Sequence, residues 1–233
     1  MASSLNASTS GGGGVIVTSD SSGNLNIQSG GSTVVAVTAT GATVTGTLAA
    51  TGASTFTGTG KFATTIGVGN ATPSASGSGI TFPATQSASS DANTLDDYEE
   101  GTWTPVLTFA TPGNLSVAYL QQVATYTKIG RAVTVSFTIR TSTFTHTTAS
   151  GAVQVTGLPF TSATVTDLSF YGGSGWRGIT KTNYTDISAE VGSNSNIVGV
   201  IASGSGQVWT DVTTADMPTS GTVILRFTIT YNV

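Results

Sequence analysis

The chain has 233 residues and a formal net charge of −4, and only 8% of the residues are charged, against about 25% in an average soluble protein. It has no cysteine, which excludes disulfides, thiolate metal sites and cysteine nucleophiles. Its seven Lys and Arg residues are scattered along the sequence and no run of about 18 apolar residues occurs, so we expect no nucleic-acid partner and no membrane insertion.

The first third of the chain is rich in Gly, Ser, Thr and Val. Residues 1–20 contain neither the basic nor the apolar part of a secretory signal. Short β-branched runs separated by Gly and Ser predict strands, because branching at Cβ suits a pleated surface. These strands are predicted at 15–19, 24–28 and 32–40.

Residues 32–60 carry no charge and are interrupted by a Thr-Gly pair every five or six residues. Segments of about four residues between glycines cannot bury a core of their own. A flexible Gly/Ser/Thr linker is one interpretation. The spaced Val44, Leu48 and Phe56 favour another, in which three chains wind together and these side chains meet on a common axis. The sequence therefore predicts a homotrimer with an intertwined β stalk over residues 21–72.

A change of composition follows the predicted stalk. Gly, Ser and Pro cluster at 73–93, which predicts a linker. Beyond it, in 94–233, residues 132–140 and 222–233 alternate between apolar and polar, as half-buried antiparallel strands do. Further strands are predicted at 102–109, 122–129, 152–157, 163–171, 184–191, 196–202 and 206–210. This spacing predicts an all-β fold, an antiparallel β-sandwich of the jelly-roll type.

Three motifs of this C-terminal part carry a resemblance. LDDYEEGTWTPVLTF (95–109), ATYTKIGRAVTVSFTI (124–139) and GLPF (157–160) resemble a C-terminal domain common in bacteriophage fibre-like virion proteins. The upstream residues 21–58 resemble the stalks of such proteins. The resemblance implies a homotrimer on the virion surface, serving as a tail fibre, a tail-tip adhesin, a head fibre or a decoration protein.

The resemblance also orders the functions that we expect. A tail-fibre adhesin comes first, with residues 1–20 attached to other virion proteins and the C-terminal domain bound to a host-surface glycan or protein. A capsid head fibre or decoration protein is the alternative. A glycan depolymerase comes last, because such enzymes need a large cleft for which the chain has little room.

Few residues of the chain are typical of catalysis. The one histidine, His146, lies in a Thr-rich stretch without a Gly-x-Ser-x-Gly motif, so we expect it to be solvated and not part of a triad. Asp96, Asp97, Glu99 and Glu100 form the only dense group of charges, which we interpret as a solvated collar at the entry to the domain. The sequence predicts no catalytic residue, no cofactor and no metal site.

The aromatic residues have two interpretations. Trp103 lies in a predicted strand, where we expect it in the core. Residues 171–184 are rich in Gly and polar side chains, which predicts a loop. That loop would display Trp176, Arg177, Lys181 and Tyr184, and aromatic faces beside polar groups suit sugar or protein surfaces. We therefore expect these four residues to form the receptor-binding site, with a packed or trimer-contacting loop as the alternative.

Overall fold

The computed structural model divides into two units, Met1–Lys61 and Phe62–Val233. The structure describes residues 25–29, 31–38, 40–50, 54–55, 57, 60–74, 76–166 and 169–233. In this part of the chain the regular elements are β-strands and one short 3-10 helix. No helix here is long and apolar enough to cross a membrane.

The first unit contains a three-stranded antiparallel sheet. Its strands are β1 (Leu25–Ser29), β2 (Ser32–Thr38) and β3 (Gly41–Val44), paired in sequence order. β1 and β2 match the strands predicted at 24–28 and 32–40, whereas the strand predicted at 15–19 lies outside the described residues. Gly31, between β1 and β2, has a positive φ of 80°, a conformation that glycine adopts without strain.

The second unit begins with a parallel pair of short strands, β4 (Thr65–Gly67) and β5 (Gly79–Thr81). β5 lies within 73–93, the stretch predicted as a linker. This stretch is bonded to the domain that follows it. The Ser89 backbone N–H donates to Asp96 Oδ2 at 2.8 Å, and Lys128 Nζ donates to Gln86 Oε1 at 3.3 Å.

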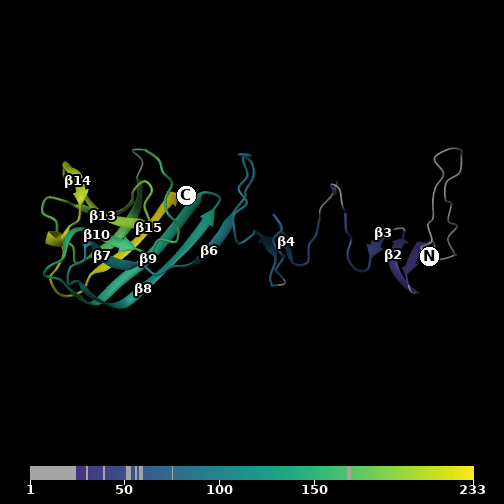
Figure 1. Ribbon diagram of the computed structural model, residues 1–233, viewed down its shortest axis with the longest axis horizontal. Coiled ribbons are helices and arrows are strands. Elements are labelled where there is room, and N and C mark those ends of the chain that lie inside the picture. Colours follow the sequence, from purple (N-terminus) through teal and green to yellow (C-terminus); the bar gives the residue numbers. More distant parts are fainter. Residues whose placement is uncertain are drawn as a thin grey trace. The chain divides into compact units, whose positions relative to one another are not determined.

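One antiparallel sheet of ten strands makes up the rest of this unit. The strands are β6 (Tyr98–Thr102), β7 (Val106–Thr111), β8 (Ser116–Ile129), β9 (Ala132–Thr145), β10 (Ser150–Thr156), β11 (Phe170–Arg177), β12 (Asp186–Val191), β13 (Ile197–Gly204), β14 (Gln207–Asp211) and β15 (Ile224–Asn232). They pair in the order β6-β8-β9-β15-β11-β12-β13-β10-β7, with β14 also on β13 (Figure 1). The 3-10 helix η1 (Thr214–Asp216) follows β14.

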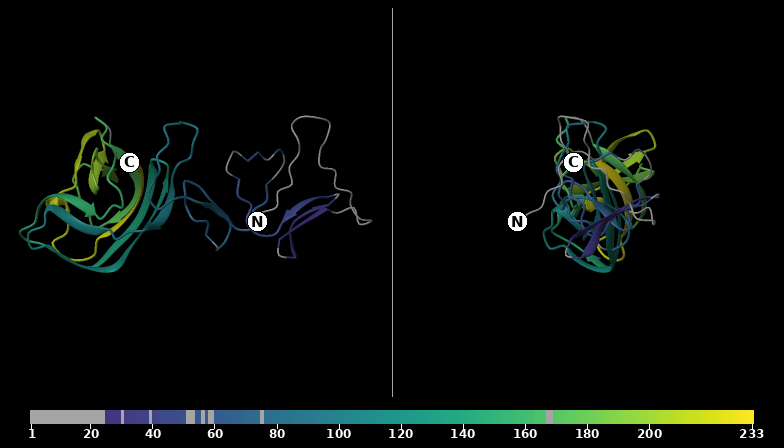
Figure 2. Two further views of the ribbon diagram at one scale, coloured as in Figure 1. Left: turned by 45° about the vertical axis from the view of Figure 1, so that its right-hand side comes forward. Right: turned by 90° about the vertical axis from the view of Figure 1, so that its right-hand side faces the viewer.

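The sheet curls until its two halves face a common core (Figure 2). β11 joins the halves, since residues 170–172 pair with β12 and residues 173–177 pair with β15. The end strands β6 and β7 are only three residues apart in the chain, so the sheet has to turn back on itself. The all-β prediction is confirmed. The structure has one continuous curled sheet where the sequence predicted a sandwich.

The predicted alternation of β9 and β15 is confirmed. The buried side chains of the stretches where the two strands pair are Val133, Val135, Phe137, Ile139, Leu225, Phe227, Ile229 and Tyr231. The residues between them are exposed or half-buried. The two strands pair without a register shift, so both apolar faces lie on the same side of the sheet. Trp103 is also buried, as predicted.

Three local predictions were wrong. The strand predicted at 102–109 is split into β6 and β7 around Pro105, which has no N–H for a ladder. The strand predicted at 163–171 begins only at Phe170, and the loop predicted at 171–184 is strand β11 as far as Arg177. At Gly172 a Cβ would lie 2.3 Å from the Thr228 carbonyl oxygen. Glycine is therefore required here because the two strands approach each other closely. In the sequence, this glycine resembled part of a loop.

Candidate functional site

The face of β9 and β15 that points away from the core carries hydroxyl side chains. Ser136 lies opposite Thr228, and Thr134 lies opposite Thr230. Their hydroxyl oxygens are 2.9 Å and 2.8 Å apart, so the two pairs are hydrogen-bonded across the strands. Cross-strand bonds of this kind stabilise the sheet and leave its outer face polar with few charges.

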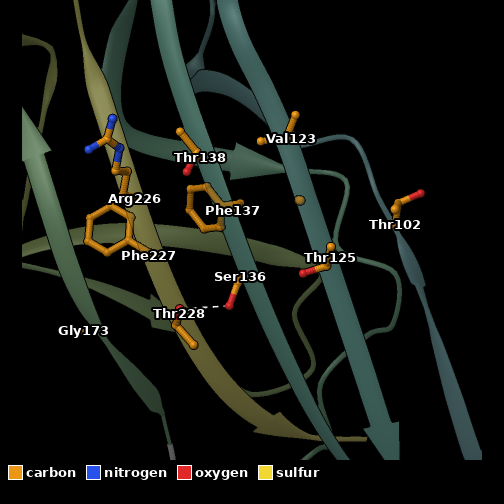
Figure 3. Close-up of a pocket in the computed structure, with 11 residues that line it drawn as sticks. Thr102, Val123, Thr125, Ser136, Phe137, Thr138, Gly173, Arg226, Phe227 and Thr228 are labelled. Carbon is orange, nitrogen blue, oxygen red and sulfur yellow. Dashed lines mark hydrogen bonds between the residues drawn. The ribbon is translucent and has the colours of Figure 1, made fainter.

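A hollow of about 630 Å³ lies over this outer face (Figure 3). Its lining includes one continuous row of neighbours across five strands. The register gives this row as Thr102, Thr125, Ser136, Thr228 and Gly173. All five side chains are short or absent, which explains why the face is hollowed here. Thr102 and Gly173 lie on opposite sides of the hollow (Figure 3).

A second row forms one side of the hollow with longer side chains. Val123, Thr138 and Arg226 are neighbours on β8, β9 and β15. The Val123 side chain is 60% exposed, an apolar surface beside a row of hydroxyls. The Arg226 guanidinium brings a positive charge to the edge of the hollow (Figure 3). The hollow thus offers methyl groups, hydroxyls and one cation, which is the chemistry of a binding surface for a polar ligand.

Two further arginines lie beside Arg226. The register places Thr138 and Gly175 opposite Arg226, and Arg140 and Arg177 follow these residues by two positions. All three arginines are exposed on the same face. The sequence showed basic residues without a cluster, but strand pairing brings these three together.

The four residues predicted to bind a receptor divide into two pairs. Trp176, which is 40% exposed, and Arg177 lie at the end of β11. Lys181 Nζ bonds Asp216 Oδ2 at 2.8 Å and the Asp211 carbonyl oxygen at 2.9 Å.

Tyr184 also makes its contacts within the fold. Its hydroxyl donates to the Val208 carbonyl oxygen at 3.1 Å, and Lys181 Nζ lies 5.6 Å from the centre of its ring. The structure therefore uses Lys181 and Tyr184 to hold β14 and η1. Trp176 and Arg177 remain available at the surface, and Arg177 belongs with the other two arginines of the outer face.

A smaller hollow lies over the other half of the sheet. Its volume is about 270 Å³, and its lining includes Gln154, Glu190, Gly199 and Asp211. Nearby on β14, Trp209 is 53% exposed. The sequence predicted a strand at 206–210 but assigned no role to Trp209 or to the carboxylates of this surface.

The three motifs that carry the resemblance pack against one another. The Trp103 ring meets the Phe137 ring edge-on at 5.6 Å, and the Tyr126 ring meets the Phe160 ring edge-on at 5.5 Å. The Trp103 indole N–H donates to the Thr125 carbonyl oxygen at 3.3 Å. Residues from 95–109, 124–139 and 157–160 therefore form one framework beneath β6, β8 and β9.

Asp97 belongs to this framework and not to a solvated collar, which corrects the sequence interpretation. Its carboxylate pairs with Lys128 Nζ, and both side chains are 7% exposed. Lys128 Nζ also lies 5.4 Å from the centre of the Phe160 ring. A buried pair of this kind is sensitive to the loss of either partner.

The other three acids of the predicted collar each accept a hydrogen bond. The donors are the Ser89 N–H for Asp96, the Tyr126 hydroxyl for Glu99 and the Tyr98 hydroxyl for Glu100. The bond from Ser89 lowers the pKa of Asp96, and the bond to Glu99 raises the pKa of the Tyr126 hydroxyl. Within the described residues, no group of three His, Cys, Asp or Glu side chains is placed to hold a metal ion.

His146 is buried, contrary to the expectation that it is solvated. Its ring lies 4.9 Å from the Phe109 ring and 5.5 Å from the Phe144 ring. Its Nε2 atom has no hydrogen-bond partner among the residues that the structure describes. His146 is two residues from Phe144, and both are buried whereas residue 145 between them is exposed. The Thr-rich sequence around His146 gave no indication of this burial.

No protein-family model matches the chain, and no curated protein matches it. Among solved structures it is similar to the crystal structure of the Dettilon tailspike protein (gp208), with 18% identity and a TM-score of 0.44. That match covers 66% of this chain and 27% of the tailspike chain.

Proposed function

We propose that this chain is a non-enzymatic surface protein of a bacteriophage virion, a trimeric adhesin of the tail-fibre type. Its C-terminal domain binds a glycan or protein of the host surface through the outer face of β6, β8, β9, β15 and β11. Residues 1–20 attach the trimer to other virion proteins. The observation that carries the adhesive role is the hollow of about 630 Å³ on that face.

The composition of the hollow supports binding of a polar surface ligand. Hydroxyls of Thr102, Thr125 and Thr228 can exchange hydrogen bonds with a sugar or a peptide. The exposed Val123 side chain offers an apolar patch for the less polar side of the ligand. Gly173 keeps one side open, since nothing lies within 4 Å of a Cβ built there.

The motif framework supports the virion assignment. Segments that resemble phage fibre proteins at three separate places in the sequence contact one another through Trp103, Phe137, Tyr126 and Phe160. The motifs that carry the resemblance thus belong to one packed unit of the C-terminal domain.

Exposed apolar side chains support the trimer. The buried core consists of residues from Trp103 onward, and the described part of the first unit contributes none of them. Leu48 is 77% exposed and Val44 is also exposed, while Phe56 lies outside the described residues. A single chain thus leaves Val44 and Leu48 uncovered, and two further copies would bury them.

Adsorption blocking tests the adhesive role. The purified full-length protein should occupy receptors on host cells and so reduce adsorption of the phage. Gly173→Tyr should abolish this effect, because the new ring fills the hollow where there is open space and no positive φ. Gly192→Tyr is the matched control, since it has the same freedom but lines the smaller hollow of the other half.

The outcomes separate the candidate functions. Loss of blocking with Gly192→Tyr alone would move the receptor site to the smaller hollow, and no blocking by the wild type would refute the adhesin. Antibody labelling of virions should mark the tail; labelling of the capsid surface would favour a head fibre or decoration protein. Release of reducing sugars from the host polysaccharide would reveal a depolymerase and contradict the non-enzymatic proposal.

A further inference from the structure

We infer that Arg140, Arg177 and Arg226 form an anion-binding subsite at the edge of the hollow, and that its ligand is a carboxylate of an acidic host polysaccharide. This inference rests on the proposed function and specifies the chemistry of the receptor. The polysaccharide chain would lie along the row of hydroxyls, with its carboxylate on the arginines.

The register of three strands determines the geometry of the subsite. Arg140 and Arg177 both lie opposite Ile224, and Arg226 is two residues from Ile224 on the same strand. Arg226 is therefore a diagonal neighbour of each of the other two arginines, at about 7 Å between Cβ atoms in a regular sheet. Neither pairing has a bulge in this stretch, so all three side chains leave the same face.

The charges of these arginines are not matched by neighbouring acids. The two ion pairs of the described residues, Lys128 with Asp97 and Lys181 with Asp216, use lysines. The chain has more acids than bases, yet three of its seven bases lie together and repel one another. A bound anion removes this repulsion, and three guanidinium groups around one spot can hold a carboxylate through paired N–H donors.

The rest of the hollow argues for a ligand that is only partly charged. The row from Thr102 to Gly173 offers hydroxyls and open space but no cation. A polymer with a phosphate on every unit would leave most of its charges unpaired there, facing a chain of net charge −4. A polysaccharide that carries a carboxylate on some of its sugars matches both the arginines and the row of hydroxyls. Its carboxylates can pair with the arginines, and its neutral sugars can form hydrogen bonds with the hydroxyls.

The test measures binding of the full-length protein to the purified surface polysaccharide of the host. Three forms of the polymer are compared: native, carboxyl-reduced, and dephosphorylated. Arg226→Gln and Arg140→Gln should each weaken binding to the native polymer about tenfold, the usual loss for one charged hydrogen-bond donor. Arg131→Gln is the matched control, because Arg131 is exposed in the turn between β8 and β9, away from the hollow.

Each outcome decides between the inference and its rivals. Carboxyl reduction should abolish the difference between the wild type and Arg226→Gln, and added salt should weaken binding of the wild type and of Arg131→Gln more than binding of Arg226→Gln. Equal affinity of all variants for the native polymer would overturn the arginine subsite. Loss of binding on dephosphorylation, with none on carboxyl reduction, would overturn the carboxylate. A wild type that does not bind host cells at all would instead refute the proposed function itself. Thermal melting of each variant should match the wild type, because all the substituted side chains are exposed.

Discussion

Substitution of Asp97 should destabilise the C-terminal domain more than substitution of any exposed acid near it. In Asp97→Asn the Lys128 ammonium stays buried, since its side chain is 7% exposed, but it loses the carboxylate that is bonded to it. The Gln86 oxygen at 3.3 Å and the Phe160 ring at 5.4 Å remain beside it. These neutral groups cannot replace a full negative charge.

The magnitude follows from these contacts. Removal of one member of a buried ion pair costs about 3–5 kcal/mol of unfolding free energy, because the other charge remains desolvated. The Asn side chain keeps one acceptor oxygen for Lys128, so we expect the lower end, about 3 kcal/mol. For a unit of this size that corresponds to a melting temperature lower by about 6–12 °C. Urea unfolding of the full chain, followed by circular dichroism at one fixed protein concentration, measures the difference.

Two further variants make this prediction refutable. The control Glu100→Gln changes an exposed acid whose carboxylate accepts one hydrogen bond, from Tyr98 at 2.7 Å, so its effect should stay within about 0.5 kcal/mol. The double variant Asp97→Asn/Lys128→Met removes both charges and should recover most of the lost stability. Equal effects of Asp97→Asn and Glu100→Gln would show that the pair is solvated, and no recovery in the double variant would show that charge is not the cause.

Three other predictions concern separate parts of the molecule. Leu48→Asp should lower the melting temperature of the trimer because it places three carboxylates near one axis, whereas Thr47→Ser should change stability by less than about 0.5 kcal/mol; equal melting of both variants would refute the stalk. His146→Phe should raise the unfolding free energy by about 1 kcal/mol because it removes a buried Nε2 without a partner, and a lower melting temperature would contradict this. Burial alone would raise the pKa of Asp216, but hydrogen bonds from Lys181 and from the Thr213 N–H and hydroxyl outweigh burial and lower the pKa. The ionised carboxylate therefore stabilises the fold above about pH 4, and this contribution is lost as the pH falls through the pKa of the folded state. Stability titrated with acid should therefore fall less steeply in Asp216→Asn than in the wild type, and parallel curves would show that the carboxylate is not ionised in this pair.

The strand assignments that succeeded have one property in common. In β9 and β15 large apolar residues occupy every second position, so the sequence alone shows which side is buried. β11 lacks this signal, because its glycines sit where other strands carry side chains. Gly172 is required by the approach of the Thr228 carbonyl oxygen, and that contact exists only once the sheet is formed. Alternation of apolar and polar residues therefore predicts a strand whose sequence is determined by burial of one face. It does not predict a strand such as β11, whose sequence is also determined by close contact with a neighbouring strand.

The candidate site could be predicted only in fragments. Arg177 was identified among the surface residues of its segment, but Arg140 and Arg226 lie 37 and 49 positions away from it in the numbering. Their proximity results from the pairing of β9, β15 and β11, which no local pattern encodes. The same holds for Asp97, which lies just before β6, whereas its partner Lys128 is 31 residues away on β8. Both features depend on register, and register follows from the complete sheet.

The scarcity of charge makes the placement of each base informative. Lys128 and Lys181 are bonded to acids that hold segments of the fold, so neither is free to act on a ligand. Hydroxyl pairs such as Ser136 with Thr228 keep the outer face polar without any charge. Solubility therefore gives no reason for several arginines to gather at one place on that face, where they repel one another. Binding of an anion does give such a reason, and it is consistent with the position of the arginines at the edge of the hollow.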